Sequence, residues 1–135
     1  MGASAPEVRA EVVVVGAGPS GSAAAAWAAR DGRDVLVVDA CEFPRDKACG
    51  DGLTPRAVAE LHALGLGDWL GGRIHHHGLR MAGYGANVEV RWPDRSFPVT
   101  SSAVPRTELD DRIRRVAVDS GAAMALGRKC VDVSR

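Results

Sequence analysis

The sequence has few cysteines, and they are not spaced as a disulfide framework or a zinc site requires. There are three of them, Cys41, Cys49 and Cys130, and no two form a C-x-x-C pair. An odd count without that spacing argues against both kinds of cross-link. Reduced thiols in the cytoplasm are therefore the simplest interpretation.

Long apolar runs and an excess of one charge are also missing. No stretch approaches the roughly 18 apolar residues that a membrane-spanning helix needs. Residues 1–9 lack the apolar core of a signal peptide, and we expect them to form a disordered tail. The chain has 17 basic and 17 acidic residues, so it offers no basic surface of the kind that binds nucleic acid.

Residues 10–39 have the pattern of one β-turn-α-β unit. A valine-rich run at 10–15 precedes a glycine-rich turn, and an alanine-rich stretch at 19–30 precedes a second apolar run at 34–39. Near-continuous apolar strands are typical of parallel sheets that are buried on both faces, and alanine is the strongest helix former. We therefore predict an α/β fold with a Rossmann-like parallel sheet.

Antiparallel strands are predicted farther along the chain. Val88, Val90 and Trp92 alternate with polar residues, which is the pattern of a half-buried strand. Weaker strands are expected near 79–83 and 97–100. Together they form a small antiparallel insert.

Between the two strand regions, one helix and two loops are expected. Residues 40–53 and 65–78 are predicted to be loops. Thr54 can cap a helix that has Pro55 at its first position, and Gly65 ends that helix.

The last helix is predicted over residues 107–120, followed by a third parallel strand at 122–126. Thr107 and Asp110 resemble a capping box at the start of the helix, although aspartate replaces the usual glutamate or glutamine. Its exposed face is expected to gain ion pairs between residues four apart, namely Asp110 with Arg114 and Asp111 with Arg115.

The glycine-rich turn has the sequence of a dinucleotide-binding fingerprint, Gly16-Ala17-Gly18-Pro19-Ser20-Gly21. In such a turn the first glycine permits the tight bend and the second lets the backbone approach a pyrophosphate. The third lets the helix pack on the strand. The free amides and positive dipole end of the helix then face the phosphates.

Asp39 ends the second strand, where a carboxylate can accept hydrogen bonds from the adenosine ribose. It would repel a 2′-phosphate, so NADP is disfavoured. The fingerprint by itself leaves FAD and NAD as alternatives, because both contain adenosine diphosphate.

The stretch FPRDKACGDGLTPRAV at residues 43–58 resembles the signature of the geranylgeranyl reductase family of FAD-dependent oxidoreductases. The later stretch VPRTELD at 104–110 matches that family's arginine-bearing helix start. The resemblance runs from about residue 10 to residue 135. Within the family, it is closest to the menaquinone reductases of mycobacterial type.

The resemblance implies FAD as cofactor and hydride transfer from reduced flavin to a carbon–carbon double bond of an isoprenoid chain. It implies an isoprenoid lipid or quinone substrate, possible peripheral association with the inner face of the plasma membrane, and no nucleic-acid partner. Cys49 would lie near the flavin ring, as a proton donor or only as part of the lining. The implied cofactor-binding residues are Gly16, Gly18, Pro19, Ser20, Gly21, Asp39, Arg45, Lys47, Cys49, Gly50, Asp51, Gly52 and Arg106.

Other interpretations of the same residues stay open on the sequence alone. Arg45 and Lys47 fit an ordinary solvated loop, and Arg106 fits a surface position. Cys49 also fits a small buried hydrophobic residue. The three adjacent histidines at 75–77 fit a solvent loop better than a metal site.

Family members are considerably longer than this chain, and their second flavin motif and substrate domain have no counterpart here. We therefore expect residues 10–135 to be the N-terminal portion of an FAD-binding domain, incomplete at its C-terminal side. On that expectation the isolated chain binds FAD weakly and does not turn over. A catalytically silent nucleotide-binding remnant and an NAD-binding dehydrogenase domain are the alternatives.

Overall fold

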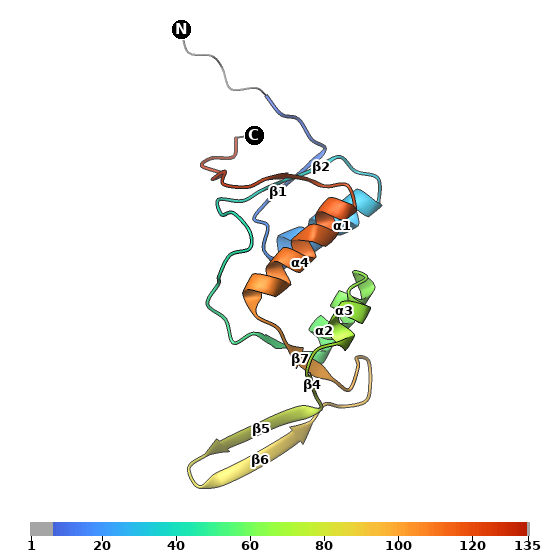
Figure 1. Ribbon diagram of the computed structural model, residues 1–135, viewed down its shortest axis with the longest axis vertical. Coiled ribbons are helices and arrows are strands. Elements are labelled where there is room, and N and C mark those ends of the chain that lie inside the picture. The colour runs from blue at the N-terminus through green and yellow to red at the C-terminus, as the bar shows by residue number, and fades with distance from the viewer. Residues whose placement is uncertain (1–6, 135) are drawn as a thin grey trace. The chain divides into compact units, whose positions relative to one another are not determined.

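The computed structural model describes residues 7–134 (Figure 1). These residues form two compact units, which are described separately below. The first unit extends to Arg45 and resumes at Asp110, and the second comprises Asp46–Leu109. The predicted disordered tail falls mainly on residues 1–6, which lie outside the described residues.

The first unit contains a sheet of three parallel strands in the order β1-β2-β8. These are β1 (Val12–Val15), β2 (Val35–Val38) and β8 (Ala123–Ala125). The helix α1 (Pro19–Arg30) connects β1 to β2. The parallel register of all three strands confirms the predicted α/β sheet.

Small side chains let α1 lie close to this sheet. Ala25 and Ala26 of α1 are fully buried, and Val35 and Val37 of β2 are at most 1% exposed. Ser22 is also buried, and its hydroxyl donates a 2.9 Å hydrogen bond to the Ala17 carbonyl, so its polarity is satisfied. Alanine thus serves both as a helix former and as a spacer.

The prediction that β1 is buried on both faces is wrong for this chain. Val13 and Val15 are 56% and 60% exposed. Alternate residues of a strand point to opposite faces, and β1 is an edge strand. Within residues 7–134, one face of β1 is therefore accessible.

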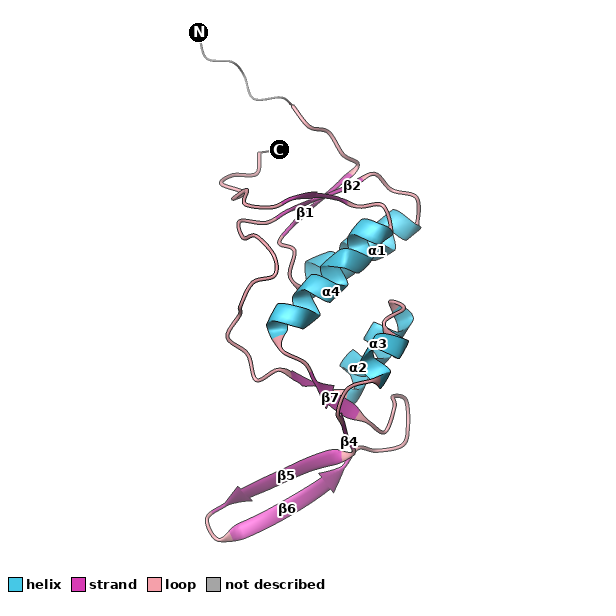
Figure 2. Ribbon diagram, in the orientation of Figure 1, coloured by secondary structure: helices cyan, strands magenta, loops and turns pink. Residues whose placement is uncertain are grey.

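The second unit contains a short three-stranded antiparallel sheet in the order β3-β7-β4. It also contains a separate hairpin of β5 and β6 (Figure 2). The sheet consists of β3 (Gly52–Leu53), β7 (Ser101–Ala103) and β4 (His75–His76). The hairpin pairs β5 (Gly78–Gly83) with β6 (Ala86–Arg91). These strands confirm the predicted antiparallel insert.

Two helices pack in the second unit, and a third begins there. They are α2 (Pro55–Ala63), α3 (Gly67–Gly71) and α4 (Arg106–Asp119). The side chain of Thr54 accepts a 3.3 Å hydrogen bond from the Ala57 amide, which confirms the predicted cap. Leu53, Val58, Leu61, Leu64, Leu66, Leu70 and Val104 are the buried apolar residues of this unit outside α4.

Residues 65–78 are not the loop that was predicted. They contain α3 and β4, and Leu70 is fully buried. The strand expected near 97–100 lies instead at β7, where the Ser102 hydroxyl donates to the Ile74 carbonyl at 2.7 Å. Burial against other elements and side-chain hydrogen bonds stabilise α3, β4 and β7. Neither kind of contact leaves a periodic pattern in the sequence.

Two further expectations need correction. The strand β6 was predicted to bury one face, but all six of its residues are exposed. Val88 and Val90, which were expected on the buried face, are about half accessible. The helix α4 begins at Arg106, which puts Thr107 inside its first turn and excludes the predicted capping box. Over residues 7–134, no helix is both long and apolar enough to cross a membrane.

The cap of α2 gives a stability prediction. We expect Thr54→Ala to lower the free energy of unfolding by about 1 kcal/mol, because the Ala57 amide loses its acceptor. The matched control is Thr107→Ala, an exposed threonine inside the first turn of α4, with an expected change within about 0.5 kcal/mol. Urea unfolding followed by circular dichroism measures both free energies, and equal effects would show that this cap hydrogen bond does not contribute to stability.

Candidate functional site

The glycine turn between β1 and α1 is fixed by two different constraints. Gly16 has a φ of +104°, a conformation that favours glycine, and its amide donates to the Val38 carbonyl at 2.8 Å. A Cβ at Gly21 would lie 1.9 Å from the Gly16 carbonyl oxygen. No side chain fits at residue 21, so the helix can approach the strand only through glycine.

The start of α1 is a helix N-terminus that no described side chain caps. Gly18 is the N-cap residue and Pro19 follows it. The first amides of a helix have no partner within the helix, and they carry the positive end of its dipole. Phosphate groups are commonly bound at such an end.

Asp39 joins the turn to the end of β2. Its Oδ2 accepts a 2.7 Å hydrogen bond from the Ala17 amide, and its Oδ1 accepts one of 2.8 Å from the Cys41 amide. The sequence predicted a ribose ligand here and did not anticipate this role in bracing the backbone. A carboxylate has further acceptor positions, so the two roles are compatible.

Arg45 lies at the same turn. Its Nη2 is 3.5 Å from the position of a Cβ built on Gly18, and 3.3 Å from Oδ2 of Asp110. Its guanidinium also stacks on the Phe43 ring, 4.9 Å from the centroid. The structure thus brings a cation to the glycine turn, within the first unit.

Asp110 is the site residue that sequence reasoning missed. It was expected on the exposed face of its helix, paired with Arg114, but it is fully buried and pairs with Arg45. The Asp111 pairs are present, with Arg114 at 2.7 Å and Arg115 at 2.8 Å. A signal existed, because Asp110 falls at helical spacing from buried Ile113 and Ala117 and so belongs to the apolar face.

A second cluster, consisting of Cys49, Asp51 and Arg106, lies in the second unit. The pKa of the Cys49 thiol is lowered, mainly by a hydrogen bond from the Asp51 backbone amide and then by one from the Arg106 guanidinium. Asp51 has a φ of 56°, and its carbonyl accepts a 2.9 Å hydrogen bond from the Val104 amide. Cys49 is exposed, so it is not the buried hydrophobic residue of the alternative interpretation.

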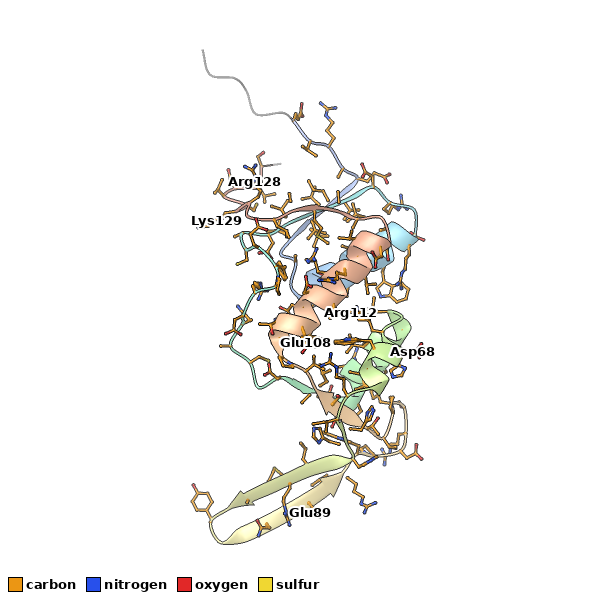
Figure 3. All side chains as sticks on the ribbon, in the orientation of Figure 1. Asp68, Glu89, Glu108, Arg112, Arg128 and Lys129 are labelled. Carbon is orange, nitrogen blue, oxygen red and sulfur yellow. The ribbon has the colours of Figure 1, made fainter. Side chains whose placement is uncertain are left out.

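The start of α4 is attached to the segment that follows α3 by an ion pair. Glu108, labelled in Figure 3, pairs with Arg73, and this cation lowers the pKa of the Glu108 carboxyl. The Arg73 guanidinium stacks on the Trp69 ring at 4.9 Å. These contacts fix the first turn of the helix that carries Arg106.

The remaining residues of the predicted loop differ in their surroundings, and Gly52 is not in a loop but in strand β3, where it pairs with Ala103 of β7. Lys47 is exposed, and a Cβ built on Gly50 meets no atom within 4 Å. A Cβ on Gly52 would meet only the Gly50 carbonyl, at 3.9 Å. Folding of this unit therefore does not by itself require glycine at 50 or 52, and neither has a positive φ. Their predicted contact with a ligand remains a prediction.

The histidine run does not form the predicted solvent loop. His75 and His76 make the strand β4, and both are exposed. Across the described residues, no group of three or more potential ligands is placed to hold a metal ion.

Arg128 and Lys129 lie on the segment that follows β8 (Figure 3), and the Arg128 amide donates to the Asp39 carbonyl at 2.8 Å.

Comparison with known proteins gives concordant results. The family model described as FAD binding domain matches residues 9–132. A menaquinone reductase of Mycolicibacterium smegmatis is 76% identical over 126 residues, which cover 93% of this chain and 31% of that protein. Digeranylgeranylglycerophospholipid reductase 1 of Methanopyrus kandleri is 33% identical over 86% of this chain and 29% of its own length.

A solved structure shares the same fold. The crystal structure of a flavoprotein/dehydrogenase from Cytophaga hutchinsonii matches with a TM-score of 0.83 and 25% identity, over 93% of this chain and 32% of that one. The chain thus spans about a third of the length of the curated relatives it matches. The family resemblance that the motifs indicated is confirmed.

The environment of Cys49 predicts a pH-dependent reactivity. The thiolate is the nucleophile, so a lowered pKa means that alkylation by iodoacetamide accelerates at a lower pH than for an ordinary thiol. We expect Arg106→Gln to move the midpoint of that pH profile upward, because one hydrogen bond to the thiolate is lost. The background for this measurement is a chain with Cys41 and Cys130 replaced by serine.

The matched control is Arg95→Gln, an exposed arginine of the same unit, which is expected to leave the midpoint unchanged. An identical midpoint in the Cys41→Ser/Cys130→Ser chain with and without Arg106→Gln would contradict the assignment of Arg106 as a partner of the thiolate.

Proposed function

Because this chain belongs to the FAD-binding domain family, we propose that it forms the flavin-binding part of an oxidoreductase of the menaquinone reductase type. The observation that carries the proposal is 76% identity to such an enzyme over 93% of the chain. The reaction we propose is reduction of a carbon–carbon double bond in the isoprenoid chain of a lipid or quinone. The similarity to an archaeal isoprenoid-lipid reductase supports that finer assignment.

Three features of the first unit support binding of the pyrophosphate of FAD there. The cradle at Gly16, Gly18 and Gly21 tolerates no Cβ at residue 21, and it ends in the uncapped start of α1. Arg45 adds a guanidinium beside Gly18, and arginine matches phosphate geometry well. Pro19 and Ser20 supply the first helical positions.

Asp39 is the residue we assign to the adenosine ribose. Two backbone amides hold its carboxylate at the end of β2, so its orientation is set before a nucleotide binds. A fixed carboxylate accepts hydrogen bonds from ribose hydroxyls and repels a 2′-phosphate. This arrangement favours FAD or NAD over NADP.

We assign the second unit's cluster to the flavin end of the cofactor. The loop at Lys47, Cys49, Gly50, Asp51 and Gly52 would lie beside the flavin, with Arg106 in contact with FAD. Bound FAD would supply a hydride from its reduced ring, and the protein would position and tune it. Saturating a double bond requires a proton as well, and Cys49 is our candidate donor because its lowered pKa makes it a stronger acid.

The substrate class determines where we place the protein. Isoprenoid lipids and quinones reside in the membrane, so we propose a cytoplasmic protein that associates peripherally with the inner face of the plasma membrane. The alternative function is a nucleotide-binding module without turnover. The glycine turn and Asp39 support this alternative, because they fit nucleotide binding and specify no reaction.

Nucleotide selectivity tests the role of Asp39. We expect the chain to bind ADP at least about ten times more tightly than the 2′-phosphorylated analogue of ADP, because the Asp39 carboxylate repels the 2′-phosphate. Asp39→Asn should narrow that ratio, since it removes the charge and retains one acceptor oxygen for the Ala17 amide. Calorimetric titration measures both affinities, and Asp68→Asn, in an exposed turn of α3, is the control. An unchanged ratio in Asp39→Asn would remove the ribose assignment.

The reaction itself is tested in the cells that encode the chain. We expect a chromosomal Gly21→Asp replacement to abolish cofactor binding, since a side chain at residue 21 meets the Gly16 carbonyl. Mass spectrometry of the extracted lipids and quinones should then show the loss of species that are heavier by two hydrogen atoms. A chromosomal Asp68→Asn replacement should leave them intact. An unchanged lipid and quinone profile in the Gly21→Asp cells would favour the silent module.

A further inference from the structure

We infer that Asp110 is a positioning residue, which holds the Arg45 guanidinium at the glycine turn in the orientation that a nucleotide's phosphates need. The inference rests on the proposed binding of FAD and deepens it. It assigns a role to a buried acid that the glycine fingerprint does not include.

The burial of Asp110 shows that it needs a charged partner. Its side chain is completely inaccessible, and its Oδ2 lies 3.3 Å from Nη2 of Arg45, whose own side chain is only 18% exposed. An isolated carboxylate in such a place is very unfavourable unless it is paired. The ion pair therefore keeps Arg45 directed toward α4 and prevents it from extending into solvent.

A second contact fixes the arginine from another direction. The Phe43 ring lies 4.9 Å from the Arg45 guanidinium and 5.8 Å from that of Arg114. Arg114 is held in turn by Asp111, through Nε at 3.0 Å and Nη2 at 2.7 Å. The loop that carries Arg45 is thus attached to α4 both by an ion pair and by aromatic stacking.

The held guanidinium lies beside the helix start at which we propose that phosphate binds. Its Nη2 is 3.5 Å from the position of a Cβ on Gly18, and Gly18 is the N-cap of α1. A phosphate at this helix start would meet both the uncapped amides and the planar N–H fork of Arg45. A long arginine side chain loses substantial rotamer freedom when it binds, and Asp110 removes that freedom in advance.

The positioning role predicts that removal of Asp110 changes phosphate affinity in the opposite direction from that predicted by net charge alone. Asp110 is an anion near the proposed phosphate position, so its removal would strengthen phosphate binding if only net charge mattered. If Asp110 orients Arg45, its removal weakens phosphate binding. Adenosine has no phosphate, so its affinity would not change in either case.

The experiment compares ADP and adenosine binding to the 135-residue chain by calorimetry. We expect Asp110→Asn to weaken ADP binding about tenfold, as for loss of a charge-assisted contact, and to leave adenosine binding unchanged. In an Arg45→Gln background, Asp110→Asn should have little further effect on ADP affinity. The matched control is Asp119→Asn, an exposed acid at the other end of α4, which should not alter ADP affinity.

A folding defect in Asp110→Asn would be recognised by a loss of adenosine binding. Arg45→Lys then provides the test, because it retains the charge beside Asp110 and removes the fork and the ring stacking. We expect an ADP affinity about tenfold lower with adenosine binding unchanged. Wild-type ADP affinity in Arg45→Lys, or equal or tighter ADP binding in a folded Asp110→Asn, would overturn the inference. Failure of the wild-type chain to bind ADP would overturn the proposed function as well.

Discussion

The contact between Gly21 and the carbonyl of Gly16 is the constraint on which the rest of the first unit depends. A Cβ at residue 21 would lie 1.9 Å from the Gly16 carbonyl oxygen, which is too close. Because Gly21 has no side chain, α1 can lie this near to β1. With the helix there, Gly18 becomes its N-cap and the Ala17 amide reaches Asp39. The position of the uncapped helix start and that of the Asp39 carboxylate beside it are therefore both consequences of one close approach.

Elements that rest on local chemistry could be predicted from the sequence. The bounds of α1 follow from its alanines and from Pro19, and the Thr54 cap follows from a threonine before Pro55. The parallel pairing of β2 with β8 follows from two apolar runs within an α/β order. Elements that rest on distant contacts could not be predicted. The helix α3 forms around the buried Leu70, in a segment whose glycines suggest a loop.

The same distinction explains the error at Asp110. A rule for pairs four residues apart on a helix treats aspartate as a surface residue, and it describes Asp111 correctly. Asp110 obeys the longer-range requirement that a buried charge be paired, and its partner is far away in the sequence. Its position on the apolar face, beside Ile113 and Ala117, conflicted with the surface interpretation. Such conflicts between local and global patterns are common at functional sites.

The acidity of Cys49 depends on a balance that a bound cofactor would shift. In the structure the thiol is exposed, and the lowering of its pKa comes from the Asp51 amide and the Arg106 guanidinium. Covering the thiol with a flavin ring would exclude water, which raises the pKa of a thiol. The lower dielectric would also strengthen the attraction between thiolate and guanidinium. With the flavin placed over Cys49 as proposed, Arg106 would therefore oppose the effect of water exclusion on the thiol. The ion pair between Glu108 and Arg73 holds the helical turn that carries Arg106.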